Sequence, residues 1–331
     1  MGRFVFRRLV ALVPVLFGVT FLSFGLMRLA GSDAVTEMYA GVGAAVSQET
    51  LDAARARLGL DRPFLVQYFS WLFGLLRGDM GVSLISGQDV FGTFLSKLPA
   101  TLLLAVSSVL LTVAVSVPLG VASAVFRQRA MTARTPFARV CCSAMDFLVR
   151  LAAFVGNSMP NFFVALLLMH FLAIRLGWLP VISGGVSPAG AVMPTLTLAI
   201  AMSAKYLRQV RAAVLDELSK DYVAGAKARG VPERVILIRS VLRSSLVTLA
   251  TLLALSVGSL LGGAAIVETI FLWDGVGKLA VDAIMMRDYP VIQAYVVWMA
   301  VIYVGVNLAV DVLYPILDPR VRLEASRNGG A

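Results

Sequence analysis

The residues able to carry out chemistry are few in this sequence, and their spacing does not favour catalysis. The single histidine, His170, lies in an apolar run, where it could bind a metal or relay a proton, although we expect a buried imidazole with satisfied hydrogen bonds. Cys141 and Cys142 are adjacent and can hardly bridge each other without strain, so we expect two small buried residues. Gly277-Lys278 lacks the flanking residues of a phosphate-binding loop. We therefore predict no catalytic residue and no cofactor bound by this chain.

The composition indicates an integral membrane protein. Of the 331 residues, 59% are hydrophobic and 15% are charged, whereas a soluble domain carries about a quarter charged residues. The net charge of +10 then reflects orientation in the bilayer. The sequence has no basic stripe with interleaved aromatic residues, so we predict no nucleic-acid site. The apolar run Leu9–Leu29 exceeds the about 7–15 residues of a signal-peptide core, so we interpret it as an uncleaved first span.

Charge sets the predicted topology. A span needs about 20 mainly apolar residues, and the clear candidates are Leu9–Leu29, Ala100–Phe126, Pro160–Leu176, Ala191–Val210, Leu246–Val267 and Val291–Leu313. Basic residues gather before the first run, after the second, between Lys205 and Arg243, and at the C-terminus, and the positive-inside rule places all these segments in the cytoplasm. If the stretch Val140–Val155 crossed the membrane, the basic segment between Lys205 and Arg243 would lie outside, against the positive-inside rule. We therefore expect this stretch to lie at the inner face or to enter only partway. The prediction is an all-α membrane protein with six spans and both termini cytoplasmic.

The segment Asp221–Arg243 is basic and helix-forming, and it lies between two of the apolar runs. The Ala-rich sequence before Gly230 forms a helix with a small surface, and Gly230 is suited to ending that helix. Pro232 suits the first turn of the next helix. Such a helix–turn–helix fits a groove in a cytosolic partner, and the alternative is an amphipathic connector on lipid headgroups. The spans lack a relay of buried Asp, Glu and His, so energy for uphill transport has to come from another chain.

Two further segments are predicted to lie on the outer side. Ala30–Pro99 carries seven acidic and five basic residues and should contain two helices, the first with Ser47 as N-cap and the second aromatic and lying on the membrane surface. Glu268–Pro290 should form a turn over Asp274–Gly277 and then a short amphipathic helix, at a depth where irregular backbone is tolerated if it lines a cavity. Small residues around Gly258 favour close packing of the fifth run against another helix.

The sequence resembles the permease subunits of ATP-binding-cassette importers with the type I fold, in the branch that imports di- and oligopeptides and nickel. The resemblance covers nearly the whole chain and includes the stretches LGLDRPFLVQYFSWL, NSMPNFFVALLL, DYVAGAKARGV, VETIFLWDGVGKLAVDAIMMRDYP and LDPRVR. The coupling loop of the family opens with Glu-Ala-Ala, where this chain has Ala224, Gly225 and Ala226. Gly230 matches the family pattern, and Arg243 stands where proline is usual.

The resemblance implies four parts: an N-terminal span (1–29), an extracytoplasmic helical insertion (30–99), a transmembrane core (100–317) and a cytoplasmic tail (318–331). The core includes a coupling loop at 212–243 and an outer re-entrant loop at 268–290. The implied partners are a second similar permease subunit, two ATP-binding subunits that hold ATP and Mg²⁺, an extracytoplasmic solute-binding protein and membrane lipid. The implied location is the bacterial cytoplasmic (inner) membrane.

The same resemblance implies roles for three groups of residues. Coupling to the ATPase is expected of Asp221, Tyr222, Ala224, Ala226, Lys227, Ala228, Gly230 and Val231. The outer gate, below the docked binding protein, is expected at Trp273, Asp274, Gly275, Gly277, Arg287, Asp288, Tyr289 and Pro290. The transport path is expected to be lined by Asn157, Ser158, Asn161, Ser203, Ser259, Glu268 and Met285.

Two classes of cargo remain open at the level of the sequence. We favour nickel, free or chelated, over small peptides, and Met285, Met286 and Asp288 can be read as soft and hard metal contacts, although methionine in an apolar helix usually packs. A rival class of function is an ATP-independent channel or secondary carrier, which predicts flux without any ATPase. A further rival is a membrane-anchored scaffold that transports nothing.

Overall fold

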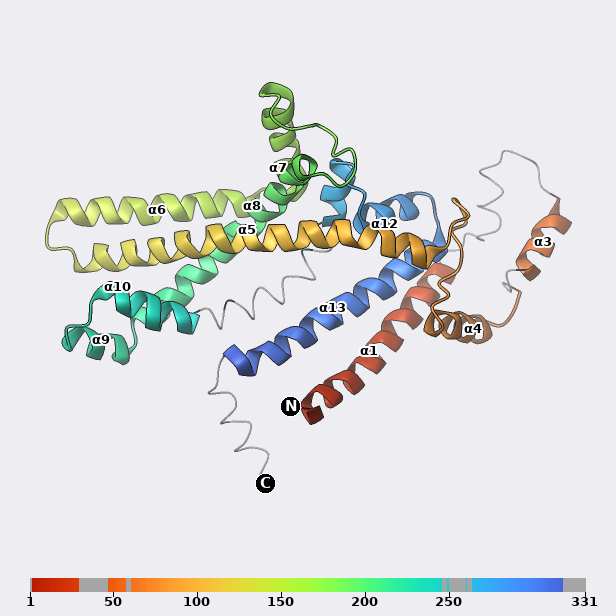
Figure 1. The fold of residues 1–331 in the computed structure, drawn as a ribbon, viewed down its shortest axis with the longest axis horizontal. Helices are drawn as coiled ribbons and strands as arrows, with labels where there is room; N and C mark the ends of the chain where they lie inside the picture. The colour runs from red at the N-terminus through yellow and green to blue at the C-terminus, as the bar shows by residue number, and fades with distance from the viewer. Residues whose placement is uncertain are drawn as a thin grey trace. The chain divides into compact units, whose positions relative to one another are not determined.

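The computed structural model describes residues 2–29, 47–57, 61–245, 249, 260 and 264–317, which are mostly helical (Figure 1). An isolated antiparallel bridge joins Val82 and Asp89. The chain divides into two compact units, the first made of Met1–Thr101 with Asp274–Leu308 and the second of Leu102–Trp273 with Ala309–Ala331. The predicted all-helical class is confirmed.

The first unit contains two predicted spans and the segments that the sequence predicts to lie on the outer side. Its helices are α1 (Gly2–Leu29), α3 (Gln48–Arg57), α4 (Phe64–Leu76), the start of α5 (Val90–Thr132), α12 (Val276–Met285) and most of α13 (Tyr289–Leu317). The predicted N-cap of α3 is present, because the Thr50 amide donates to Ser47 Oγ at 3.3 Å. The predicted turn over Asp274–Gly277 is shorter than expected, since α12 already begins at Val276.

An aromatic cluster joins α4 to α1. Tyr68 is fully buried, and its hydroxyl lies 2.9 Å from Thr20 Oγ1. The rings around Tyr68 make edge and tilted contacts at 5.2–6.2 Å and belong to Phe17, Phe21, Phe24, Phe69 and Trp71. The aromatic face of α4, predicted to lie on the membrane surface, thus packs in part on the first span. The apolar side chains of Leu65, Phe73 and Leu76 remain exposed on the other face.

The second unit carries the helices around the basic segment. They are the remainder of α5, α6 (Pro136–Ser158), α7 (Asn161–Leu168) with the π-helix η1 (Met169–Arg175), α8 (Pro188–Leu218), α9 (Asp221–Ala228), and α10 (Glu233–Val235) with the π-helix η2 (Ile236–Leu242). The chain bends by 102° between α6 and α7. Pro160 lies in this break and has no amide hydrogen to continue α6, which explains the bend. The break therefore lies between Ser158, the last residue of α6, and Asn161, the first of α7.

Helices α5 and α8 run in the same direction in close contact. Two hydrogen bonds join residues with the same separation of 88 positions, Ser107 with Thr195 and Ser123 with Arg211. The contact face of α5 repeats a small residue every four positions, at Ser108, Thr112, Ser116, Gly120 and Ala124. A methyl group on Gly120 would lie 2.6 Å from Val210 Cβ, so only glycine permits this approach. Close packing by small residues was predicted for the fifth run, most of which lies outside the described residues.

Among the residues that the structure describes, four helices are long and apolar enough to span a membrane, and α6 with α7 and η1 would make a fifth if the bent pair counts as one span. The four correspond to the predicted first, second, fourth and sixth runs. The fifth run, Leu246–Val267, lies mostly outside the described residues. The count of six spans and the side on which each terminus lies therefore stay predictions, as does the partial entry of Val140–Val155.

Candidate coupling and gate sites

Helix α9 begins and ends where the sequence predicts. Gly230 has a φ of 76°, in the left-handed region where a side chain would be strained. The Gly230 amide donates to the Lys227 carbonyl at 3.0 Å, and the Val231 amide donates to the Ala226 carbonyl at 3.1 Å, which satisfies carbonyls left open at the helix end. The glycine therefore fixes the turn that separates α9 from the next helix.

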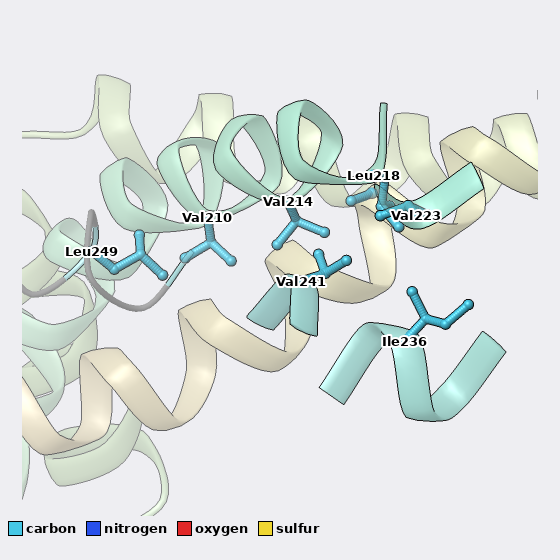
Figure 2. Close-up of a cluster of buried hydrophobic side chains, with 8 residues drawn as sticks. Val210, Val214, Leu218, Val223, Ile236, Val241 and Leu249 are labelled. Carbon is cyan, nitrogen blue, oxygen red and sulfur yellow. The ribbon is translucent and has the colours of Figure 1, made fainter. Parts of the chain in front are cut away.

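A buried hydrophobic cluster attaches α9 to the second unit. Val223 is 1% exposed and packs with Val214 and Leu218 of α8 and with Ile236 and Val241 of η2 (Figure 2). The helices on both sides of Gly230 therefore share one small core with the end of α8. This shared core means that α9 is held by α8 and η2 and is not a loosely attached loop.

A carboxylate reinforces the junction between α8 and α9. Glu217, in the last turn of α8, accepts a hydrogen bond from the Tyr222 hydroxyl at 2.8 Å and forms an ion pair with Lys220. Both partners lie at the start of α9. The orientation of this short helix is consequently fixed by a polar contact on one side and by Val223 on the other.

The predicted coupling residues divide into two sets. Those with exposed side chains or backbone are Asp221, Tyr222, Ala224, Lys227, Ala228 and Gly230. Ala226 and Val231 are half-buried and pack against the cluster around Val223. The exposed set offers a small, partly charged surface to a partner, and the half-buried pair belongs to the support beneath it.

The outer loop is fixed by contacts within the first unit. The Val276 amide, at the start of α12, donates to Thr101 Oγ1 at 2.8 Å. Asp274 is exposed and forms an ion pair with Lys97 of α5. Gly275 and Gly277 are buried, so the first turn of α12 packs closely against its surroundings. These contacts hold the predicted gate residues Asp274, Gly275 and Gly277 together.

The end of the outer loop packs on the segment that follows α4. Asp288 is 4% exposed and accepts hydrogen bonds from Ser83 Oγ at 2.5 Å and from the Leu84 amide at 3.2 Å. Arg287 has a φ of 56°, a conformation uncommon for a non-glycine residue. A pocket of about 130 Å³ adjoins Asp288 and is lined by Ser83, Thr93, Leu279, Asp282 and Met286 among others.

The remaining gate residues do not line this pocket. Tyr289 and Pro290 open α13 and are partly buried. Trp273 is fully buried in the second unit, and its amide donates to the Glu268 carbonyl at 2.8 Å. Trp273 is therefore a core residue of that unit, and its side chain is not available on the surface of the described chain.

The proposed metal contacts do not form a metal site. Met285 is 79% exposed, whereas the Asp288 carboxylate is buried and already accepts two hydrogen bonds. Within the described ranges no three His, Cys, Asp or Glu side chains gather as a metal ion requires. His170 is exposed and makes an edge contact with Phe171 at 5.3 Å, so the prediction of a buried imidazole was wrong. Cys141 is likewise exposed, contrary to its predicted burial.

The predicted path residues are only partly gathered. Asn157 and Ser158 end α6, and Asn161 begins α7 across the break. A side chain at the neighbouring Gly156 would meet Ala204 of α8 at 3.1 Å, which places the buried Ser203 near this corner.

Three other path candidates belong to other parts of the chain. Glu268 is fully buried in the second unit. Met285 belongs to the first unit. Ser259 lies outside the described residues. The structure therefore groups Asn157, Ser158, Asn161 and Ser203 around one corner.

Sequence reasoning missed Asp146, which is 2% exposed and bonded to residues of three helices. A signal was present, because Asp146 and Arg150 stand four apart inside the ambiguous stretch Val140–Val155. An acidic residue in an apolar helix usually needs a partner, and here that partner, Arg211, is remote in the sequence.

Comparison with known families agrees with these features. The family of binding-protein-dependent transport system inner membrane components matches residues 138–323, and the N-terminal part of such components matches residues 1–105. The chain belongs to this family and is a permease subunit, a non-catalytic multi-pass component of the inner membrane.

Relatives of similar length match almost end to end. The oligopeptide transport system permease protein AppB of Bacillus subtilis (strain 168) is 35% identical, over 97% of this chain and 99% of the relative. The glutathione transport system permease protein GsiC of Escherichia coli (strain K12) is 34% identical, over the same shares. A chain from inward-facing crystal forms of the MetNI methionine ABC transporter matches with a TM-score of 0.56 at 17% identity, over 68% of this chain and 96% of that one. The last match shows a shared fold.

Proposed function

We propose that this chain is the permease subunit of an ATP-driven importer that carries small peptides, of the oligopeptide or glutathione type, into the cell. The observation that carries the proposal is the end-to-end similarity to permeases of those two transport systems. The exposed face of α9 supports the coupling role, because a short helix held from behind by Val223 can transmit force from a partner. ATP and Mg²⁺ then bind to that partner and not to this chain.

The complete transporter contains a second similar permease subunit, two ATP-binding subunits and an extracytoplasmic solute-binding protein. Closure of the ATP-binding subunits moves α9, and the attached α8 tilts with it, so that the path opens alternately to the two sides. The binding protein docks over the outer loop, where α12 is fixed to α5 through Thr101 and Asp288 is fixed to the segment after α4. Transport is thus driven from the inner side and supplied from the outer side.

Peptides are a better-supported cargo than nickel. The relatives described above are named for oligopeptides and glutathione, and nickel appears in neither name. The residues read as nickel contacts also lack the arrangement of a metal site, since Met285 is exposed and Asp288 is occupied by Ser83 and Leu84. Specificity in such a transporter rests largely with the binding protein, so the path itself does not need a dedicated cargo site.

The test begins with purification of the tagged chain from its own membranes, with mass spectrometry of the proteins that accompany it. We expect two ATP-binding subunits, either of two kinds or two copies of one kind, together with a second permease and a solute-binding protein. The complex is then reconstituted in vesicles, and ATP-dependent uptake is measured for labelled di- and oligopeptides, glutathione and Ni²⁺. Uptake that proceeds without ATP would identify a channel or carrier instead, and a complex without any ATP-binding subunit would overturn the proposal. Uptake of Ni²⁺ but of no peptide would reverse the assignment of cargo.

A further inference from the structure

A buried polar network joins three helices of the second unit. Asp146 of α6 accepts hydrogen bonds from Ser123 Oγ of α5 at 2.6 Å and from Arg211 of α8, whose Nε and terminal nitrogen lie 2.9 and 3.1 Å from the two carboxylate oxygens. Arg211 Nε also donates to Ser123 Oγ at 3.1 Å. Arg150 approaches the carboxylate at 3.4 Å from the next turn of α6. The network is complete, because both carboxylate oxygens and the hydroxyl have partners.

The geometry of this network restricts how the helices can move. Arg211 grips the carboxylate with two parallel hydrogen bonds, which fixes direction as well as distance. Asp146 is 2% exposed, and separating it from Arg211 would leave a buried charge unpaired. Sliding or rotation of α6 on α8 therefore meets a steep energetic penalty.

The network is attached directly to the coupling helix. Arg211 lies on α8, and the same helix continues to Val214 and Leu218, which pack on Val223 of α9. Glu217 of α8 also bonds Tyr222 of α9. A push on α9 thus reaches α8 within the few turns that carry Arg211, and from Arg211 it reaches α5 and α6.

We propose that Asp146 is a positioning residue for energy coupling: its network with Ser123 and Arg211 locks α5, α6 and α8 into one rigid body that moves with α9. Without this network, the movement of α9 shifts α8 alone and is not transmitted to α6 or to the corner at Asn157 and Asn161. The inference rests on the proposed function and names how the stroke travels within this subunit.

The first experiment replaces Asp146 by Asn in the complete, reconstituted transporter. Asp146→Asn keeps the shape of the side chain and removes the charge that pairs with Arg211. We expect uptake per ATP hydrolysed to fall at least about fivefold while ATP hydrolysis per assembled complex persists. An unchanged ratio of uptake to hydrolysis, or a loss of both in proportion to the amount of complex, would overturn the lock. Arg211→Lys keeps the charge without the paired grip and is measured in the same way if Asp146→Asn fails to assemble.

The second experiment asks whether α6 and α8 move together. Gly156 and Ala204 are replaced by Cys in a chain where Cys141 and Cys142 are Ala, because the two Cβ positions lie 3.1 Å apart, slightly closer than the about 3.5–4.5 Å of a disulfide. We expect the oxidised pair to keep uptake in the parent chain and to restore coupling to Asp146→Asn, with the rescue lost on reduction. Oxidation that blocks uptake in the parent would show that α6 and α8 move relative to each other. A formed disulfide that does not rescue Asp146→Asn would also overturn the proposal.

These outcomes are distinguishable from failure of the proposed function. If the parent complex shows no ATP-dependent uptake of peptide, glutathione or Ni²⁺, the function itself is wrong and the ratio of uptake to hydrolysis cannot be defined. If the parent transports and Asp146→Asn transports with equal efficiency, only the rigid-body inference fails.

Discussion

Gly230 shows how a single backbone angle shapes the coupling segment. Its φ of 76° is open to glycine but costs other residues roughly 1–2 kcal/mol, and the amides of Gly230 and Val231 close the end of α9. A Cβ at this position would meet no atom within 4 Å, so the penalty comes from the backbone alone. Glycine is therefore needed here for the direction of the chain after α9 and not for close packing.

We expect Gly230→Val to abolish or strongly reduce uptake and binding of the ATP-binding subunits, while membrane insertion stays normal, because the strained turn redirects α9. The measurement is co-purification of those subunits together with ATP-dependent uptake. Gly177→Val is the matched control, since Gly177 also has a positive φ of 64° and an open surrounding but lies outside the coupling segment. Unchanged uptake by Gly230→Val would count against the role of this turn.

Single residues also show what the sequence can and cannot predict. The stop at Gly230 and the cap at Ser47 were predictable, because both depend on local backbone chemistry. Burial of His170 and Cys141 was predicted wrongly, because an apolar run does not reveal which of its faces the chain covers. Asp146 was missed because its partner Arg211 is 65 residues away, and single-sequence patterns carry no such distance.

At the level of elements, the close packing of α5 on α8 depends on a residue without a side chain at the contact. Gly120 faces Val210 and the Leu207 carbonyl at distances that leave no room for a methyl group. That α5 spans the membrane could be predicted from the length of its apolar run. The face of small residues that contacts α8 could not be predicted, since Ser and Thr in a span are also common as ordinary packing residues.

We expect Gly120→Ala to destabilise the subunit by roughly 1–3 kcal/mol, because α5 has to move away from α8 or Val210 has to leave its preferred rotamer. Thermal unfolding of the detergent-solubilised protein gives the shift in midpoint. Val210→Ala in the same chain should recover part of the loss by vacating the space. Gly18→Ala serves as control, because nothing lies within 4 Å of a Cβ there. Equal midpoints for Gly120→Ala and the parent would contradict the close approach.

For the whole molecule, the orientation in the membrane follows from charge and stays a prediction. The structure supplies helices long enough to span, and the family places them in the inner membrane. The side on which each loop lies rests on the gathering of nine basic residues between Lys205 and Arg243.

We expect a cysteine placed at Lys227 to be inaccessible to a membrane-impermeant thiol reagent added to intact cells and to react after the cells are opened. A cysteine placed at Gln88, in the predicted outer segment, should react in intact cells. Both variants are made in the chain where Cys141 and Cys142 are Ala, and labelling is read by a shift in gel mobility. Reaction at Lys227 from outside would reverse the topology and remove α9 from the reach of any ATP-binding subunit.

The close contact between α5 and α8 has a consequence for how this subunit can diverge. Since Gly120 of α5 leaves no room for a methyl group beside Val210 of α8, a larger residue on one helix is tolerated there only when the facing residue shrinks. Aligned relatives should accordingly exchange bulk between such partners, for instance between Gly120 and Val210, and keep the summed volume constant. The two helices would then drift as a pair in evolution, even where the loops between them change freely.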